Sequence, residues 1–191
     1  MKVLEAIRSG SKLLKKKNIN TYVLDSELLL SKSLNKSREE ILINLGQNLN
    51  KRALIDFNKY LIRRSKCEPI AYLLGEKEFW SKKFFVNKDT LIPRPETELL
   101  VEKLVVFFKK KRITILDIGT GSGCIILSLL SELKNSTGIA VDISGKAIVV
   151  AKKNAYKFKL SDRIKFFNKS FEDLYDEKFD LIVSNPPYIK R

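Results

Sequence analysis

The chain has 191 residues, of which 44% are hydrophobic, and its formal net charge is +15 at pH 7. A chain of this length buries roughly 70% of its unfolded surface, so it needs no metal or disulfide to fold. Its apolar runs are far shorter than the ~20 residues of a membrane-spanning helix, and its two cysteines, Cys67 and Cys124, are isolated. These features argue against an integral membrane protein and a disulfide framework, and they predict a cytoplasmic protein.

The chain contains no histidine, which removes the commonest general base and the commonest metal ligand. We therefore expect no metal site, and chemistry that needs little proton transfer by the protein. A basic charge is compatible with a nucleic-acid partner. The lysines are spread over the whole sequence, however, and the runs 15–17 and 109–112 fall at predicted helix ends, where cations stabilise the helix dipole.

Residues 1–75 are predicted to form a small bundle of short helices. Apolar residues recur at helical spacing through the segment, with Gly10 as a weak point in the first helix. Ser37 followed by Glu40 is a capping box that predicts another helix start. Because the segment offers no nucleophile and no acid–base pair, we interpret it as a substrate-recognition domain, with a purely structural role as the alternative.

Residues 76–95 are predicted to form a β-hairpin and a linker. The runs 78–80 and 84–86 are typical of short strands, with Ser81-Lys82-Lys83 as the turn between them. Two prolines follow, and Pro95 suits the first turn of a helix that runs to about residue 111. Helix capping does not explain Arg94 between the two prolines, which makes it a candidate for the lining of a ligand pocket.

Residues 96–191 alternate between strand and helix patterns, which predicts an α/β domain with a parallel sheet. Four short apolar runs are the expected strands, and two longer amphipathic segments are the expected helices between them. The strands are predicted at 113–116, 137–141, 164–167 and 179–183, and the helices at 124–133 and 145–158.

A glycine-rich turn follows the first of these strands, with the sequence Asp117-Ile118-Gly119-Thr120-Gly121-Ser122-Gly123. Its glycines let the backbone pass close to a ligand at a helix N-terminus. A dinucleotide site has the spacing G-x-G-x-x-G, whereas this turn has G-x-G-x-G with an acid before it. The ammonium of S-adenosylmethionine is balanced by such an acid, so this cofactor fits better. No Gly-Lys-Ser/Thr follows, which excludes a P-loop.

Asp142 ends the second predicted strand, about twenty residues after the glycine turn. An acid at this place in a nucleoside-binding α/β unit accepts hydrogen bonds from both ribose hydroxyls. A hydrogen bond to a charged acceptor contributes about 1.5–3 kcal/mol. The alternative is that Asp142 or Ser144 only caps the following helix, and the two roles are compatible.

The last predicted strand leads into Ser184-Asn185-Pro186-Pro187-Tyr188. Two prolines remove backbone donors and leave a rigid set of acceptors, namely the Asn185 side-chain oxygen and the carbonyls near Pro186. Tyr188 adds an aromatic face. Such a site suits a planar group with an NH2, because the acceptors hold its N–H bonds and aim the nitrogen lone pair at an electrophile. The alternative is a simple proline-rich turn.

Together these motifs resemble class I S-adenosylmethionine-dependent methyltransferases that act on amide or exocyclic nitrogens. The upstream segments Glu68–Gly75, Glu78–Trp80 and Leu91–Glu98 are similar to the HemK/PrmC family of protein-glutamine N5-methyltransferases. Members of that family modify the glutamine of the Gly-Gly-Gln motif in class 1 peptide chain release factors. The resemblance implies a Rossmann-like methyltransferase fold with a small N-terminal helical bundle, and a release factor as protein substrate.

The resemblance also implies roles for individual residues. The glycine turn wraps the methionine end of the cofactor, Asp142 holds the ribose, and Asn185 with the Pro186 carbonyl binds the substrate amide. Lys169 stands where the family often has an acid near the adenine. The implied cofactor-binding residues are Asp117, Gly119, Thr120, Gly121, Ser122, Gly123, Asp142, Ser170, Phe171 and Asn185. The implied catalytic residues are Asn185, Pro186, Pro187 and Tyr188.

Family members continue for several strands and helices beyond the point that corresponds to Arg191. We therefore expect residues 96–191 to hold only the N-terminal part of the methyltransferase domain, as a fragment, an interrupted gene product or part of a split protein. The expected state is a monomer unless another chain completes it. Two alternatives stay open: a nucleic-acid adenine or cytosine N-methyltransferase, which binds nucleic acid directly, and an inactive cofactor-binding fragment.

Overall fold

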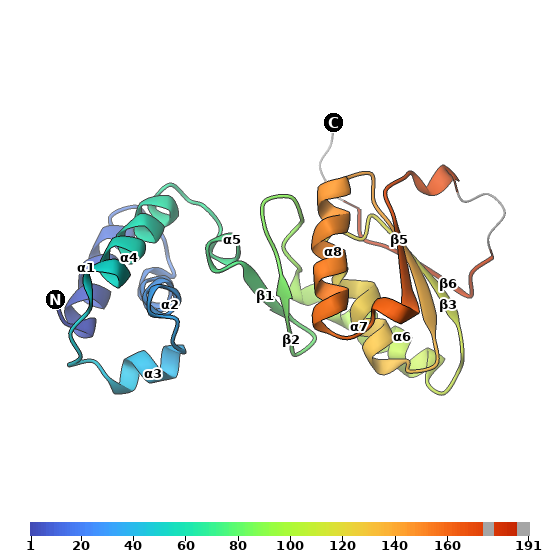
Figure 1. Ribbon diagram of the computed structural model, residues 1–191, viewed down its shortest axis with the longest axis horizontal. Coiled ribbons are helices and arrows are strands. Elements are labelled where there is room, and N and C mark those ends of the chain that lie inside the picture. Colours follow the sequence, from blue (N-terminus) through green and yellow to red (C-terminus); the bar gives the residue numbers. More distant parts are fainter. Residues whose placement is uncertain (174–177, 187–191) are drawn as a thin grey trace. The chain divides into compact units, whose positions relative to one another are not determined.

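The computed structural model describes residues 1–173 and 178–186. Contacts divide the chain into two compact units, Met1–Gly75 and Glu76–Arg191. The first unit is helical, and the second contains a hairpin and a sheet with helices (Figure 1).

The helical unit packs its helices around one apolar core. The capping box predicted at Ser37 is present, because Ser37 Oγ accepts from the Glu40 amide at 3.2 Å and the Glu40 carboxylate accepts from the Ser37 amide at 2.6 Å. The core is formed mainly by Val3, Ala6, Ile7, Leu14, Leu29, Leu30, Ile41, Phe57 and Leu61. The helices are α1 (Val3–Lys15), α2 (Tyr22–Leu34), α3 (Arg38–Ile43), α4 (Lys51–Ser65) and α5 (Ile70–Leu74).

Gly10 does not weaken the first helix, since α1 runs unbroken through it. A Cβ atom at this position would lie 2.5 Å from Ser26 Oγ and 2.9 Å from Phe57 Cζ. The glycine therefore allows α2 and α4 to approach the α1 backbone closely. The Ser26 hydroxyl uses this proximity to donate to the Ile7 carbonyl at 3.0 Å.

A buried ion pair joins α2 to α4. Arg64 Nε donates to Asp25 Oδ2 at 2.7 Å, and the Thr21 hydroxyl donates to the same oxygen at 2.9 Å. The Asp25 side chain is only 3% exposed. A buried carboxylate is tolerated when its oxygens are paired in this way.

The hairpin consists of β1 (Glu76–Phe79) and β2 (Lys82–Phe85), which pair antiparallel. The predicted three-residue turn at 81–83 is wrong: the turn is Trp80-Ser81, with Phe79 opposite Lys82. Both turn residues have positive φ, 52° and 54°, as in the tight turns that match the twist of paired strands. The Trp80 amide and indole donate to Glu98 and Glu132, both at 3.0 Å, and these bonds offset the unusual backbone.

The rest of the second unit confirms the predicted parallel sheet. Its strands are β3 (Thr114–Ile118), β4 (Thr137–Val141), β5 (Ile164–Phe167) and β6 (Leu181–Ser184), in the order β5-β4-β3-β6. Helix α6 (Glu98–Phe108) precedes β3, α7 (Cys124–Glu132) connects β3 to β4, and α8 (Gly145–Lys157) follows β4. Because all four strands are parallel, their carboxyl ends meet at one edge of the sheet, where ligands bind in such folds.

The core of this unit lies where α7 packs on β3 and β4, and α8 on β5. Ile115 and Ala140 from the sheet meet Ile126, Leu129 and Leu130 from α7, and all five are fully buried. A smaller apolar cluster around Leu116 and Val141 includes Ile118, Ile139, Phe167 and Phe179. On β6, the outermost of the described strands on its side, Ile182 is exposed.

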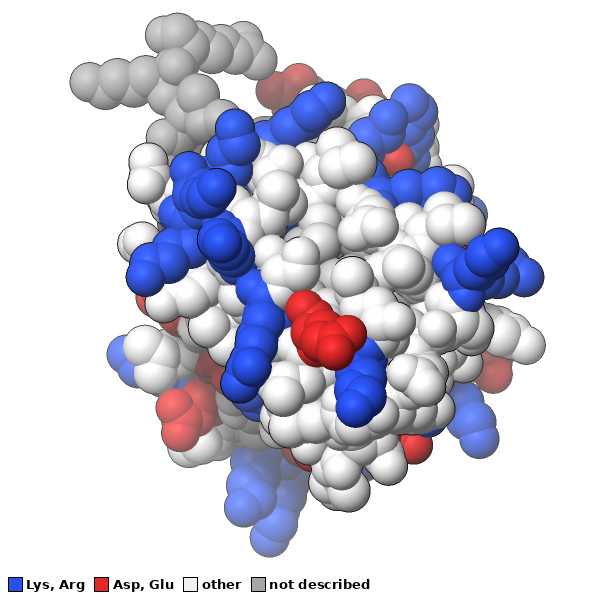
Figure 2. All heavy atoms as spheres, turned by 90° about the vertical axis from the view of Figure 1, so that its left-hand side faces the viewer, with Lys and Arg blue, Asp and Glu red and all other residues white. Residues whose placement is uncertain are grey.

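Basic residues dominate the surface charge. Residues 1–75 contain 15 Lys and Arg against 7 Asp and Glu, and Figure 2 shows Lys and Arg scattered widely over one face, with few acids among them. This distribution agrees with a general bias rather than a single compact patch. No described helix is long and apolar enough to span a membrane.

Candidate cofactor and substrate site

The glycine turn lies between β3 and α7, at the carboxyl edge of the sheet. Gly119, Gly121 and Gly123 have φ values of +69°, +56° and +79°, a region that residues with a Cβ rarely adopt. The amides of Gly119 and Thr120 both donate to the Val141 carbonyl, at 2.9 and 3.0 Å. These hydrogen bonds hold the turn at the end of β4, so the backbone of the turn lies at the carboxyl edge of the sheet.

Asp142 follows β4 directly and binds the same turn. Its Oδ2 accepts from the Gly121 amide at 2.9 Å, and its Oδ1 accepts from the Ser144 amide at 2.8 Å. Ser144 caps α8 by accepting a hydrogen bond from the Ala147 amide, so Asp142 is not the cap of this helix. A carboxylate has about four lone-pair sites, which leaves acceptor capacity on each oxygen.

Asp117 is buried beneath the turn, and the Thr120 hydroxyl donates to its Oδ2 at 2.7 Å. Burial raises the pKa of Asp117 to about 7, the charge of Asp142 adds to this rise, and the Thr120 hydrogen bond opposes it. Burial likewise raises the pKa of Cys124 to about 12. The Cys124 thiol thus stays neutral and is not a nucleophile.

A cavity of about 430 Å³ opens at this edge of the sheet. Six of the predicted cofactor residues line this cavity: Gly119, Gly121, Asp142, Ser170, Phe171 and Asn185. Thr120 and Ser122 are buried, and they do not line it, nor do Asp117 and Gly123. The remaining wall residues are Asp89, Thr90, Leu91, Ile118, Val141, Ile143, Ser144, Ala147 and Lys169.

The wall residues that the sequence did not single out include Ile143, Asp89 and Thr90. Ile143 is 83% exposed beside the cavity; Phe171, a predicted cofactor residue that follows β5, is 52% exposed and also lines it. An apolar residue directly after a candidate ribose acid was a signal for Ile143. Asp89 and Thr90 come from the loop after β2, where the Asn87 side chain accepts from the Asp89 amide at 2.9 Å.

Asn185 follows β6 and lines a second pocket, of about 350 Å³, as well as the first cavity. The Ser184 hydroxyl fixes this strand end by donating to the Ile118 carbonyl at 3.0 Å. Pro186 is exposed, and the predicted residues Pro187 and Tyr188 lie outside the described residues. The second pocket is lined by Arg94, Glu96, Thr97, Leu100, Ser184 and Asn185.

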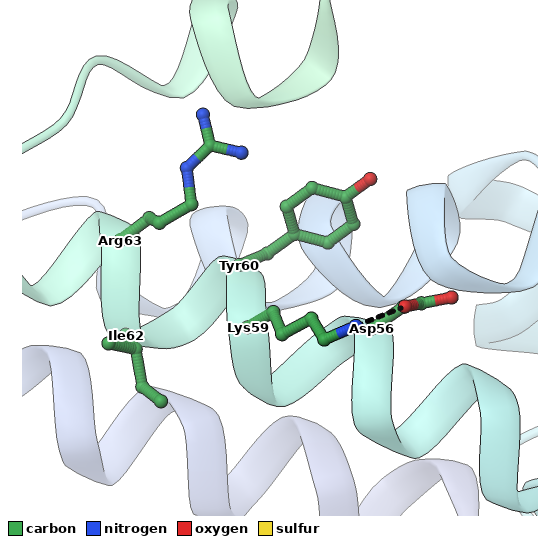
Figure 3. Close-up of a pocket in the computed structure, with 5 residues that line it drawn as sticks. All are labelled: Asp56, Lys59, Tyr60, Ile62 and Arg63. Carbon is green, nitrogen blue, oxygen red and sulfur yellow. Dashed lines mark ion pairs between the residues drawn. The ribbon is translucent and has the colours of Figure 1, made fainter.

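The helical unit has a separate hollow on α4 (Figure 3). Asp56 and Lys59, three residues apart on this helix, form an ion pair at 3.6 Å, and Tyr60, Ile62 and Arg63 complete the lining. All five residues come from one helix. Nowhere in the described residues do three or more His, Cys, Asp or Glu side chains gather as metal ligands would.

Comparison with known proteins decides the family. Residues 5–75 match the PrmC N-terminal domain, and residues 95–191 match the methyltransferase small domain. The release factor glutamine methyltransferase of Buchnera aphidicola subsp. Baizongia pistaciae is 43% identical over 190 residues, which cover 99% of this chain and 68% of that protein. The chain belongs to the release factor glutamine methyltransferase family.

Two further relatives agree with this membership. The release factor glutamine methyltransferase of Buchnera aphidicola subsp. Schizaphis graminum is 46% identical over 86% of this chain and 60% of its own length. The bifunctional methyltransferase of Rickettsia prowazekii is 42% identical over 98% of this chain and 40% of its own length. The chain thus spans about two fifths to two thirds of the length of these relatives.

Family membership confirms the family that the sequence motifs predicted. The matched domain and the parallel sheet together confirm the class I methyltransferase fold.

Proposed function

We propose that the 430 Å³ cavity binds S-adenosyl-L-methionine. The free lone pairs of Asp142 accept the ribose hydroxyls, and Ile143 and Phe171 flank the adenine. The glycine turn approaches the methionine end through its backbone, and Asp117 beneath it balances the ammonium. Bound there, this cofactor supplies a methyl group on a positively charged sulfur, which is already a strong electrophile.

We propose further that the acceptor is the side-chain amide of the glutamine in the Gly-Gly-Gln motif of class 1 peptide chain release factors. The observation that carries this proposal is that Asn185 lines both the cofactor cavity and the adjoining pocket. An amide held there by the Asn185 oxygen and the Pro186 carbonyl has its nitrogen beside the cofactor, and Pro187 and Tyr188 complete the substrate site.

Alignment supplies most of the catalysis in this proposal. The amide nitrogen would form a bond to the methyl carbon, the bond from that carbon to sulfur would break with its electron pair left on sulfur, and the nitrogen would release one proton to water. No histidine is available as a base, and none is required. Holding two reactants in line contributes roughly 7–11 kcal/mol.

The test is methyl transfer from labelled cofactor, with peptide mapping by mass spectrometry. We expect label on the glutamine of a release factor and none on a release factor whose motif is changed to Gly-Gly-Asn. An RNA arm in the same assay addresses the alternative. Label in RNA, with none in the release factor, would contradict the proposal.

We also propose that residues 1–75 recognise the release factor, with 76–95 as a linker and 96–191 as the cofactor-binding part. Around the hollow on α4 (Figure 3), Ile62 is exposed, Tyr60 is partly buried, and Lys59 and Arg63 are cationic. Ile62→Glu should weaken release-factor binding and leave cofactor affinity unchanged. Ile43→Glu, on α3 and even more exposed, is the matched control.

In this proposal the chain acts in the cytoplasm as a monomer. The two free cysteines, Cys67 and Cys124, suit a reducing compartment. Sedimentation at several protein concentrations tests the oligomeric state, and a concentration-dependent dimer would contradict a monomer.

A further inference from the structure

Asn154 lies in the middle of α8 and is fully buried. Its Oδ1 accepts from the Phe85 amide at 2.7 Å, and its Nδ2 donates to the Phe85 carbonyl at 3.0 Å. The second Nδ2 hydrogen is donated to the Ser122 carbonyl at 2.9 Å. Both amide hydrogens and the oxygen therefore have partners.

These bonds join two segments that reach the same cavity. Ser122 belongs to the glycine turn, and Phe85 ends β2, just before the Asp89–Leu91 wall. The partners are 32 and 69 residues from Asn154 in the sequence. A buried amide is costly unless it is paired, so an apolar residue would be the simpler choice for packing alone.

We propose that Asn154 is a positioning residue of the cofactor site, which holds the glycine turn at Ser122 and couples it to the end of the hairpin. This inference rests on the proposed cofactor function. Asn154 contacts the turn through the Ser122 carbonyl and acts through it, since Asn154 itself does not line the cavity.

Lys153, the neighbouring residue on α8, provides a matched control. Its Nζ lies 3.5 Å from the centre of the Phe85 ring. Lys153→Ala therefore loosens the hairpin side of the contact and leaves the Ser122 bond in place. In contrast, Asn154→Leu removes all three bonds at similar volume. Asn154→Asp keeps the acceptor for the Phe85 amide and loses the donors.

The experiment measures S-adenosylmethionine affinity by calorimetry and amide exchange at Gly121, Gly123 and Phe85, with and without cofactor. We expect both Asn154 variants to bind about tenfold more weakly or worse, as the loss of buried hydrogen bonds implies. Cofactor should slow exchange at Phe85 in the unmodified chain and in Lys153→Ala, but not in the Asn154 variants. A merely structural role would lower stability without removing this coupling.

Each other outcome decides the question. Asn154 variants that bind like the unmodified chain and keep the coupling would overturn the inference. Unfolding of both Asn154 variants while Lys153→Ala folds would also overturn it, because the residue would then serve the whole fold. If the unmodified chain binds no cofactor, the proposed function fails. Amide exchange at Gly121 and Gly123 without cofactor then still tests the role of Asn154. Faster exchange in the Asn154 variants alone supports the inference, and equal exchange in all the proteins overturns it.

Discussion

The carboxylate of Asp142 accepts a hydrogen bond from the Gly121 amide across 2.9 Å. The residue proposed to hold the ribose thus also fixes the turn proposed to surround the methionine end. The bond spans 21 residues of sequence, and it brings together the ends of β3 and β4. Both halves of the proposed cofactor site therefore depend on the Asp142 side chain.

The buried carboxyl of Asp117 makes stability depend on pH. Its pKa is raised to about 7 in the fold, against about 3.9 in an unfolded chain. The folded state binds the Asp117 proton more tightly than the unfolded state does. The contribution of Asp117 to the free energy of unfolding therefore falls as pH rises from about 4 to about 7, and it stays constant above about pH 7. Asp117→Asn, which keeps an acceptor for Thr120, should flatten this dependence.

Denaturant unfolding of both proteins at about pH 5 and about pH 8 measures this difference. The variant should gain stability relative to the unmodified chain at the higher pH. If the unmodified chain instead becomes more stable relative to the variant as pH rises, the raised pKa of Asp117 is contradicted.

Gly123 should not tolerate a side chain. Its φ is +79°, and a Cβ atom would lie 2.9 Å from Leu127 Cδ1. Gly123→Ala should destabilise the protein by about 1–2 kcal/mol through backbone strain alone, with a further cost from the displaced leucine. Thermal unfolding checks this, with Gly46→Ala as control because Gly46 is exposed and has open space around it. Equal melting temperatures for the two variants would refute the prediction.

The Asp25–Arg64 pair should matter far more than the Asp56–Lys59 pair. Asp25→Ala leaves Arg64, which is only 16% exposed, without its partner, and breaking a buried pair in this way costs about 3–5 kcal/mol. The Asp56–Lys59 pair is exposed and spans 3.6 Å, so Asp56→Ala should cost less than about 1 kcal/mol. Urea unfolding followed by circular dichroism compares them, and similar losses would show that the buried pair has no special role.

Asn185→Ala should separate methyl transfer from cofactor binding. The change removes the acceptor that we propose for the substrate amide, so transfer should fall about a hundredfold, the scale of a misplaced reactant. Cofactor affinity should change much less, because Asn185 is only one of many residues around the cavity. The control is Ser131→Ala on α7, which lines neither pocket and loses only a hydroxyl that donates to the Leu127 carbonyl. If Asn185→Ala transfers methyl groups as fast as the unmodified chain, Asn185 has no role in the mechanism.

The sheet and the glycine turn were predictable because their signals are local. Mostly apolar runs of four or five residues, each followed by turn residues, mark the four strands of the parallel sheet. The glycines of the turn have positive φ values, which the glycine-rich sequence itself suggests. The place of Asp142 at the end of β4 was predictable because the acid directly follows an apolar strand pattern, about twenty residues after the turn.

Other features depend on contacts that the sequence does not display. The five-residue helix α5 is too short to form alone; Ala71 and Leu73 are buried, and Lys32 Nζ donates to the Leu74 carbonyl at 2.8 Å. The Trp80-Ser81 turn depends on acceptors at Glu98 and Glu132. Asn154 looks like an ordinary helix residue until the fold brings Ser122 to it.

The most direct measurement is calorimetric titration of the 191-residue chain with S-adenosylmethionine, beside Asp142→Ala and Asp162→Ala. Asp162 is an exposed acid at the opposite edge of the sheet, next to β5. We predict binding to the unmodified chain and to Asp162→Ala, and a loss of about 1.5–3 kcal/mol in Asp142→Ala, which is roughly 10- to 150-fold in affinity. A folded chain that binds no cofactor, or equal affinity in Asp142→Ala, would contradict the proposed site.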